Sequence, residues 1–241
     1  MIESINNDKV KYYTKLNDKK YRQSEHLFIA SGEHLVKEAL KKGIVKEIFL
    51  LKGRENLYGD NVTYVTEDIL KKVSNLDTNP WILAICYIKE NNDIIGNVII
   101  LDNIKDPGNL GTIIRSSVAF NYKTIILSKE CVDIYNSKVV RASEGMLFNI
   151  NIIISDLKPI LTTLKDMNYK IYGTDVNKGK KPFKEENKHA LIIGSEAKGM
   201  NKDLDNYLDD YLYIKMNKDC ESLNAGVSAS ILMYELGGID D

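Results

Sequence analysis

The stretch 97-NVIILDNIKDPGNLGTIIRSSVAF-120 decides the fold class of the second half of the chain. An apolar run, NVIIL, leads into the turn DPG, and the apolar-periodic segment NLGTIIRSSVAF leads out of it. This order predicts a strand, a glycine-bearing turn and a helix, which often hold a phosphate or a dinucleotide. The glycines form neither G-x-G-x-x-G nor G-x-x-x-x-G-K, and a plain nucleotide loop would not need Asn109 and Arg115. The stretch therefore predicts a strand–turn–helix unit that holds something other than a dinucleotide.

The same order of strand and helix recurs through the rest of the chain. We expect strands at 97–101, 123–127, 149–154, 170–174, 189–194 and 211–216, and helices at 108–120, near 134–142, at 157–167 and at 222–236. Short, continuously apolar strands that alternate with helices favour a mostly parallel sheet covered on both faces. The fold class is α/β.

The first ninety or so residues predict a smaller α/β sandwich. Strands are expected at 24–31, 46–51, 62–65 and 81–88, and helices at 32–42, with Gly43 as the stop signal, and at 66–73, where Thr66 could cap. Residues 89–97, KENNDIIGN, then break the pattern with charge, Asn and Gly. The sequence thus predicts two domains, residues 1–92 and 93–241.

Charge is balanced overall, with a formal net charge of −1, but it is uneven along the chain. Between residues 9 and 22 six basic residues face one acid, with three tyrosines interleaved. Such a composition suits contact with phosphates and unstacked bases. A solvated amphipathic helix would have the same composition. The candidate RNA-binding residues here are Lys9, Lys11, Lys15, Lys19, Lys20 and Arg22.

Several protein classes are disfavoured by what the sequence contains. The three cysteines and three histidines are scattered without metal-ligand spacing, so we expect no metal. No apolar run approaches the roughly 18 residues of a membrane span, and the first residues, MIESINNDKV, have no apolar core of a signal peptide. A reduced cytoplasmic protein is expected.

Three segments with unusual polar residues follow predicted strands of the second half, at 102–117, 192–200 and 214–226. Ligands of open parallel sheets bind beyond the carboxyl ends of the strands, so these segments should converge. Each could be ordinary by itself: DPG forms turns, the second could be a polar loop, and Ser222 could cap the last helix. Together they predict a functional site.

These segments carry a resemblance to a known family. DNIKDPGNLGTIIRSSVAF, LIIGSEAKGM and IKMNKDCESLNAGVSASILMYEL resemble the three ordered motifs of the SpoU (TrmH-like) RNA 2′-O-ribose methyltransferases of the SPOUT superfamily. RASEGMLFNI, residues 141–150, resembles that family's intervening R-x-S-x-G-x-x-F element. The first ninety residues resemble the substrate-binding domain often fused to these enzymes, which is related to small ribosomal RNA-binding proteins. The resemblance covers essentially the whole chain.

The resemblance implies a parallel-sheet catalytic SPOUT domain with a deep trefoil knot, a homodimer, S-adenosyl-L-methionine as methyl donor and a ribose 2′-hydroxyl of structured RNA as acceptor. The N-terminal domain favours 23S ribosomal RNA by analogy of fold. Transfer RNA is the alternative substrate, and a non-catalytic RNA-binding protein of the same fold is the alternative function. A nicotinamide-dependent oxidoreductase is disfavoured because the dinucleotide motif is missing.

The resemblance also implies roles for individual residues. Asn109 would place the ribose or the arginine. Arg115 would act as general base or, as we favour because its pKa lies above about 12, as an electrostatic stabiliser and phosphate clamp. Glu196 is the alternative proton acceptor, and Ser222 and Asn224 line the same site. The implied cofactor-binding residues are Thr174, Gly194, Ile214, Met216 and Leu223. Arg141 would bind phosphate or serve a dimer interface.

Overall fold

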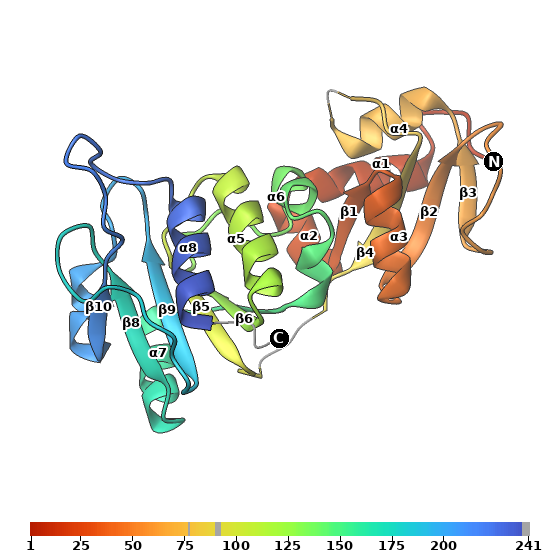
Figure 1. Ribbon diagram of the computed structural model, residues 1–241. Helices are drawn as coiled ribbons and strands as arrows, with labels where there is room; N and C mark the ends of the chain where they lie inside the picture. The colour runs from red at the N-terminus through yellow and green to blue at the C-terminus, as the bar shows by residue number, and fades with distance from the viewer. Residues whose placement is uncertain (77, 90–92, 238–241) are drawn as a thin grey trace. The chain divides into compact units, whose positions relative to one another are not determined.

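The computed structural model describes residues 1–76, 78–89 and 93–237 (Figure 1). The chain forms two compact units, one of Met1–Glu90 with Asp133–Phe148 and one of Asn91–Val132 with Asn149–Asp241. The predicted domain boundary, between residues 92 and 93, borders on residues 90–92, which lie outside the described residues. The segment Asp133–Phe148 groups with the first unit although it follows the first strand–helix pair of the second half in sequence.

The first unit contains a four-stranded sheet in the order β1-β4-β2-β3 (Figure 1). Strand β4 is antiparallel to both neighbours, whereas β2 and β3 are parallel. Its strands and helices are β1 (Leu27–Ser31), β2 (Val45–Leu51), β3 (Val62–Val65), β4 (Ile82–Tyr87), α1 (Asp8–Thr14), η1 (Lys15–Asn17), α2 (Lys19–Glu25), α3 (Glu33–Lys41), α4 (Glu67–Ser74) and α6 (Ser137–Ala142), followed by η2 (Met146–Asn149).

The strands and helices expected in the first ninety residues are all present, with ends that differ by up to three residues. Helix α3 ends where Gly43 was expected to stop it, and Gly43 has the positive φ of 62° that favours glycine. Thr66 occupies the N-cap position of α4, but its side chain makes no capping hydrogen bond. The core forms where apolar side chains of α1 and α4 pack on the sheet, among them Val10, Tyr13, Leu70, Val73, Phe49, Leu83 and Ile85.

The second unit contains a six-stranded sheet in the order β10-β8-β9-β5-β6-β7, and every pairing in it is parallel. Its strands are β5 (Asn97–Asp102), β6 (Tyr122–Leu127), β7 (Asn151–Ile154), β8 (Lys170–Thr174), β9 (His189–Gly194) and β10 (Asp210–Leu212). The predicted parallel sheet is confirmed. The prediction that the last strand extends to 216 is wrong: β10 ends at Leu212, opposite Thr174, the last residue of its neighbour β8.

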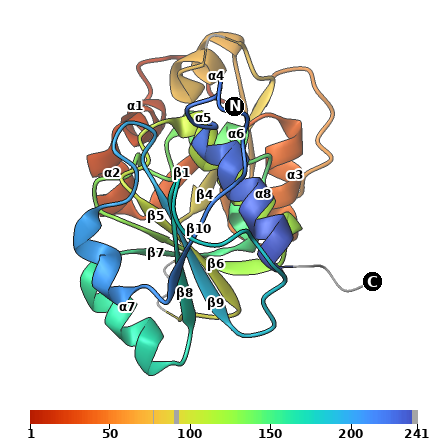
Figure 2. The ribbon, with the colours of Figure 1, turned by 60° about the vertical axis from the view of Figure 1, so that its left-hand side comes forward.

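Helices cover both faces of this sheet, as predicted (Figures 1 and 2). Helices α5 (Pro107–Ala119) and α8 (Ala225–Gly237) lie side by side over one face. Helix α7 (Leu157–Asp166) and the 3₁₀ segment η3 (Lys202–Tyr207) cover the other, where Leu157, Leu161, Leu164 and Leu204 join the buried strand residues Ile100, Ile126 and Ile192. Within the described residues, no helix is long and apolar enough to cross a membrane.

Candidate active site

The three segments expected to converge follow β5, β9 and β10 at the carboxyl ends of the parallel strands, where β5 and β9 are neighbours and β8 lies between β9 and β10. Asp102, the last residue of β5, is paired with Gly194, the last residue of β9. On the other side of β9, the Thr174 hydroxyl at the end of β8 donates to the Ile192 carbonyl at 3.0 Å, and Thr174 pairs with Leu212 at the end of β10. The loops that leave these strands therefore begin close together, at the carboxyl ends of the strands.

The loop after β9 folds back sharply at two glycines. Ser195 and Gly199 exchange backbone hydrogen bonds of 3.1 and 2.8 Å, and Gly199 has a φ of +66°. A Cβ atom on Gly194 would lie 2.1 Å from the carbonyl carbon of Gly199, a distance that no side chain can occupy. The glycines of GSEAKGM are thus needed for the turn itself, and the turn brings its backbone to the edge of the sheet.

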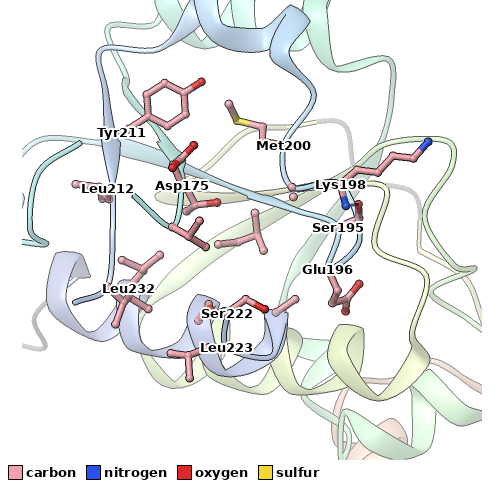
Figure 3. A pocket seen from close by; sticks show the side chains of 18 of the residues that line it. Asp175, Ser195, Glu196, Lys198, Met200, Tyr211, Leu212, Ser222, Leu223 and Leu232 are labelled. Carbon is pink, nitrogen blue, oxygen red and sulfur yellow. Dashed lines mark hydrogen bonds between the residues drawn. The ribbon is translucent and has the colours of Figure 1, made fainter. Parts of the chain in front are cut away.

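The loops and the end of β8 surround a cavity of about 460 Å³ (Figure 3). Ile193, Leu212, Leu223 and Leu232 supply apolar side chains to its lining, and polar side chains such as Glu196 complete it. The lining therefore combines apolar side chains with charged and hydroxyl groups, and a cavity of this volume is in the range of sites for small organic ligands.

The five residues implied to bind the cofactor all line this cavity: Thr174, Gly194, Ile214, Met216 and Leu223. They come from three separate parts of the chain, at the ends of β8 and β9 and in the irregular segment that joins β10 to α8. Ile214 and Met216 both lie in that segment, which is irregular where a strand was expected.

Several charged residues of the cavity were not predicted from the sequence. Lys178, Lys198 and Lys202 supply three ammonium groups to its lining, and Asp175 supplies a carboxylate. The Lys178 ammonium lies 3.7 Å from the centroid of the Tyr211 ring, and its hydrogen bond with Tyr211 raises the pKa of Lys178. Only Lys198 lies inside a motif, and the loop after β8 gave no pattern from which Lys178 could be found.

One hydrogen bond connects Asn109, at the start of α5, with the lining of the cavity. The Asp106 carboxylate caps α5 by accepting from the Asn109 backbone N–H at 2.7 Å, with Pro107 in the first turn. The Asn109 side chain, which is 8% exposed, donates through Nδ2 to Oε1 of Glu196. Glu196 lines the cavity, so the loops after β5 and β9 are joined at its border.

Arg115 lies on α5 six residues after Asn109, with an exposed side chain. It does not line the cavity. Within the described part of the chain it makes no ion pair. The guanidinium is therefore available to a ligand that approaches α5 from solvent.

Ser222 lines the cavity, whereas Asn224 does not. Asn224 instead caps α8, since its Oδ1 accepts from the Val227 N–H at 3.2 Å and its carbonyl from the Ser228 N–H at 2.9 Å. The alternative that Ser222 caps this helix is wrong, because the helix begins only at Ala225. The site role implied for Asn224 stays a prediction.

The six basic residues of 9–22 have different environments in the first unit. Lys9 is paired with Glu47 at 2.8 Å and Lys11 with Asp8 at 3.7 Å. Lys15 lies over the ring of Tyr21, 5.4 Å from its centroid, and Lys19 and Lys20 are exposed. Three of the lysines thus remain accessible without an acidic partner in the described part of the chain: Lys15, Lys19 and Lys20.

Arg22 differs from these lysines because it is only 5% exposed. Its Nε donates to Asp133 Oδ2 at 2.9 Å, its Nη2 also contacts that oxygen, and its Nη1 donates to the Leu16 carbonyl at 2.6 Å. These bonds give Arg22 a structural role within the first unit. Arg141, the remaining candidate for RNA, lies on α6 with an exposed side chain.

Comparison with known proteins identifies two matches to families. Residues 96–234 match the SpoU rRNA Methylase family, and residues 7–84 match the MRM3-like substrate binding domain. No group of three or more His, Cys, Asp or Glu side chains that could hold a metal ion occurs among the described residues, and the absence of a metal stays a prediction.

Individual proteins are similar along nearly the whole chain. The 23S rRNA (guanosine(2553)-2′-O)-methyltransferase RlmP of Bacillus subtilis is 37% identical, over 98% of this chain and 99% of its own. The crystal structure of an rRNA methyltransferase from Sinorhizobium meliloti has a TM-score of 0.86 at 24% identity, covering 97% and 95% of the chains. Its AdoMet-bound form has a TM-score of 0.83 at the same identity and coverage. From these matches, the chain belongs to the SpoU rRNA Methylase family.

Proposed function

We propose that this protein transfers a methyl group from S-adenosyl-L-methionine to a ribose 2′-hydroxyl of 23S ribosomal RNA. The observation that carries the proposal is the hydrogen bond between Asn109 and Glu196, which joins the first turn of α5 to the cavity lining in the loop after β9. Family membership and the 37% identity to a 23S rRNA 2′-O-methyltransferase support it.

The cavity fits the proposed methyl donor in size and in chemistry. Its volume of about 460 Å³ suits a nucleoside joined to an amino acid, and its apolar side chains suit an adenine ring. We assign the backbone groups of Gly194, Ile214 and Leu223 to the adenosine, with Thr174 and Met216 beside them. When bound, the donor supplies an electrophilic methyl group on a sulfonium.

The residues around Asn109 would position the acceptor ribose. Methyl transfer needs the ribose oxygen in line with the methyl group at about 3–3.5 Å, so correct placement supplies much of the acceleration. The buried amide of Asn109 is fixed at its nitrogen by Glu196, which leaves its oxygen to accept from a ribose hydroxyl or from Arg115. Ser222, on the cavity lining, adds a hydroxyl.

We assign Arg115 to the developing negative charge and to an RNA phosphate. A guanidinium that stays protonated stabilises an alkoxide without accepting its proton. Glu196 is an exposed carboxylate on the cavity lining and is the group assigned to accept the proton.

RNA capture is assigned to the first ninety residues, which match the MRM3-like substrate binding domain. Lys15, Lys19 and Lys20 are the candidates there for phosphate contacts, together with Arg141. The homodimer, the trefoil knot and the cytoplasmic location are further parts of the proposal that follow from the family resemblance. A transfer RNA substrate is the second candidate within the same activity.

The experiment that tests the function is transfer of a radiolabelled methyl group to total RNA from a host that lacks the protein. Label in the 23S fraction supports the proposal, and label in the transfer RNA fraction would replace its substrate. The Arg115→Ala variant should transfer no label while its affinity for S-adenosylmethionine, measured by calorimetry, stays within about threefold. A wild type that neither transfers label to any RNA nor binds S-adenosylmethionine would contradict the proposal in favour of a non-catalytic RNA-binding protein.

A further inference from the structure

The first unit contains a second cavity, of about 190 Å³. Leu16, Ile29 and Tyr135 contribute to its lining. We call it the amide pocket, after the polar residues that line the rest of it: Asn17, Arg22, Asn75, Asn136, Ser137 and Lys138. Its volume is that of several water molecules of about 30 Å³ each, and it is smaller than the roughly 300–1,000 Å³ of a site for a drug-sized molecule. One planar heterocycle is the size of ligand that it fits.

The amide pocket is held open by contacts between distant parts of the chain. Arg22 on α2 is bound to Asp133, and the Tyr135 ring packs on Phe28 of β1 with centroids 4.9 Å apart. The Asn17 amide ties η1 to α4 by donating to the Val73 carbonyl at 3.0 Å. Because these contacts fix its walls, the pocket is formed before any ligand binds, which lowers the entropic cost of binding.

The polar side chains of the amide pocket present both donors and acceptors. Asn17 uses Nδ2 twice, for the Thr14 and Val73 carbonyls, and so keeps its Oδ1 as an acceptor. Asn136 uses Oδ1 to cap α6 at the Lys138 N–H, 2.9 Å away, and so keeps its Nδ2 as a donor. The edge of a nucleobase offers the same mixture, and unpaired bases of RNA are read by such groups.

The charged side chains in the lining of the amide pocket, Arg22 and Lys138, are both cationic. Next to lining residues in sequence lie the exposed Lys15, before Leu16, and the exposed Asp18, after Asn17. Among the described residues that line the pocket there is no carboxylate. The nearby Asp133 is already neutralised by Arg22. A ligand with a phosphate attached to its heterocycle is therefore favoured over a neutral one.

From these observations we propose that the amide pocket binds one unpaired nucleotide of the substrate RNA, with its base inside the pocket and its phosphate at Lys138. The inference rests on the proposed function, because RNA is the substrate there. It adds that residues 135–138, which lie within the match to the methylase family, help to read RNA as part of the first unit.

A pair of matched variants tests the charge requirement. Asn75 has a φ of +50° and is exposed, and Asn168, in the second unit, has a φ of +60° and is exposed. Asp is tolerated at such positions, so Asn75→Asp and Asn168→Asp each add one carboxylate at the same backbone geometry. We expect Asn75→Asp to weaken binding of a 23S rRNA transcript by about tenfold in filter binding at 0.15 M salt, where exposed charges are screened beyond about 8 Å. Asn168→Asp should change the dissociation constant by less than about twofold.

The Ser137→Trp variant tests whether a base enters the amide pocket. It fills the pocket without changing charge, and we expect an RNA affinity at least about tenfold weaker at an unchanged melting temperature. If Ser137→Trp is folded and binds the transcript normally, the inference is wrong. This holds even if Lys138→Ala weakens RNA binding, because that loss would then come from surface charge alone. If Ser137→Trp does not fold, Asn75→Asp alone decides, and normal binding by it overturns the inference.

The same measurements separate this inference from the proposed function. A wild-type protein that binds the transcript through the amide pocket but does not methylate it contradicts the function and leaves the pocket intact. A wild-type protein that methylates the transcript, with variants that bind it as tightly as the wild type, contradicts the pocket and leaves the function intact. A wild-type protein that does not bind RNA overturns both.

Discussion

The Asn109 side chain on helix α5 donates a hydrogen bond to the carboxylate of Glu196 in the loop after β9. The two residues are 87 positions apart in sequence, and the contact exists because β5 and β9 are neighbours in the parallel sheet. It fixes the orientation of an amide that is 8% exposed, through a carboxylate that lines the cavity of about 460 Å³. The contact therefore links the segment 102–117, which is assigned to the acceptor ribose, to the segment 192–200, which lines the cavity.

Asn109→Asp tests this link. The substitution keeps the shape but places a second carboxylate against Glu196, and replacing a buried donor in this way costs about 2–3 kcal/mol. We expect kcat/KM for methyl transfer to fall about 30–100-fold while the dissociation constant of S-adenosylmethionine changes by less than about threefold. Asn201→Asp, at the N-cap of η3, is the control for an added carboxylate. Equal losses in methyl transfer and in affinity for S-adenosylmethionine would contradict a role of Asn109 in positioning the acceptor ribose.

Gly194→Ala tests the turn that borders the cavity. The new Cβ would meet the backbone of Gly199 at 2.1 Å, so the turn must open and the cavity must change shape. We expect cofactor binding, measured by calorimetry, to weaken by at least about tenfold. Gly199→Ala is the matched control, because nothing lies within 4 Å of its Cβ and only its φ of +66° is unfavourable, at about 1 kcal/mol. The two variants would behave alike if steric contact at Gly194 were unimportant.

Much of the fold could be predicted because its signals are local. Continuous apolar runs and turn residues predicted the parallel sheet and its helices, and the edge where ligands bind followed from the carboxyl ends of the strands. The five residues assigned to the cofactor, which line the cavity at this end of the sheet, were implied by the resemblance to the SpoU methyltransferases and not by these local signals. A strand was predicted at 211–216, but β10 covers only Asp210–Leu212, which pair with the last three residues of β8.

The features that could not be predicted from the sequence depend on contacts between residues far apart in the chain. Arg22 has the same local composition around it as Lys19 and Lys20, yet it is buried, because Asp133 lies 111 positions away in sequence and beside it in the fold. The grouping of Asp133–Phe148 with the first unit depends on the same contact and on the packing of Phe28 against Tyr135 and Phe148. Neither could be read from composition or periodicity.

Glu47→Gln tests a buried network of the first unit by its dependence on pH. Burial would raise the pKa of Glu47, but hydrogen bonds from Lys9, Thr63 and Tyr13 outweigh it and lower the pKa below the ordinary 4.5. Because the pKa of Glu47 is lower in the folded state, the unfolded state binds more protons at pH values between the two pKa values. The stabilisation by ionised Glu47 is therefore complete above about pH 4.5, and it is lost as the pH falls through the folded-state pKa.

We therefore expect Glu47→Gln to lower the free energy of unfolding by about 1–3 kcal/mol at pH 7, measured by urea denaturation. The difference from the wild type should shrink as the pH falls below 4.5. The exposed Glu55→Gln should show no such difference at any pH. A difference that stays constant from pH 7 to pH 3.5 would contradict the ionised network.

Arg22→Ala tests whether this arginine is structural. Removing one partner of a buried ion pair leaves the other charge unpaired, at a cost of about 3 kcal/mol in the free energy of unfolding. The exposed Lys19→Ala, on the same helix, should change stability by less than about 0.5 kcal/mol. Asp133→Ala should remove much of the effect of Arg22→Ala when the two are combined. If Arg22→Ala leaves stability unchanged but weakens RNA binding, the structural role is wrong and Arg22 binds RNA as first predicted.

The most direct test of the account is to locate the methyl group on the RNA. An unmodified 23S rRNA transcript is incubated with the protein and S-adenosylmethionine and then partly hydrolysed with alkali. A 2′-O-methyl group removes the nucleophile for this cleavage, so the account predicts one phosphodiester bond that resists alkali after treatment with the wild type and not with Arg115→Ala. Methyl transfer to the transcript without any protected bond would place the methyl group on a base and contradict ribose methylation.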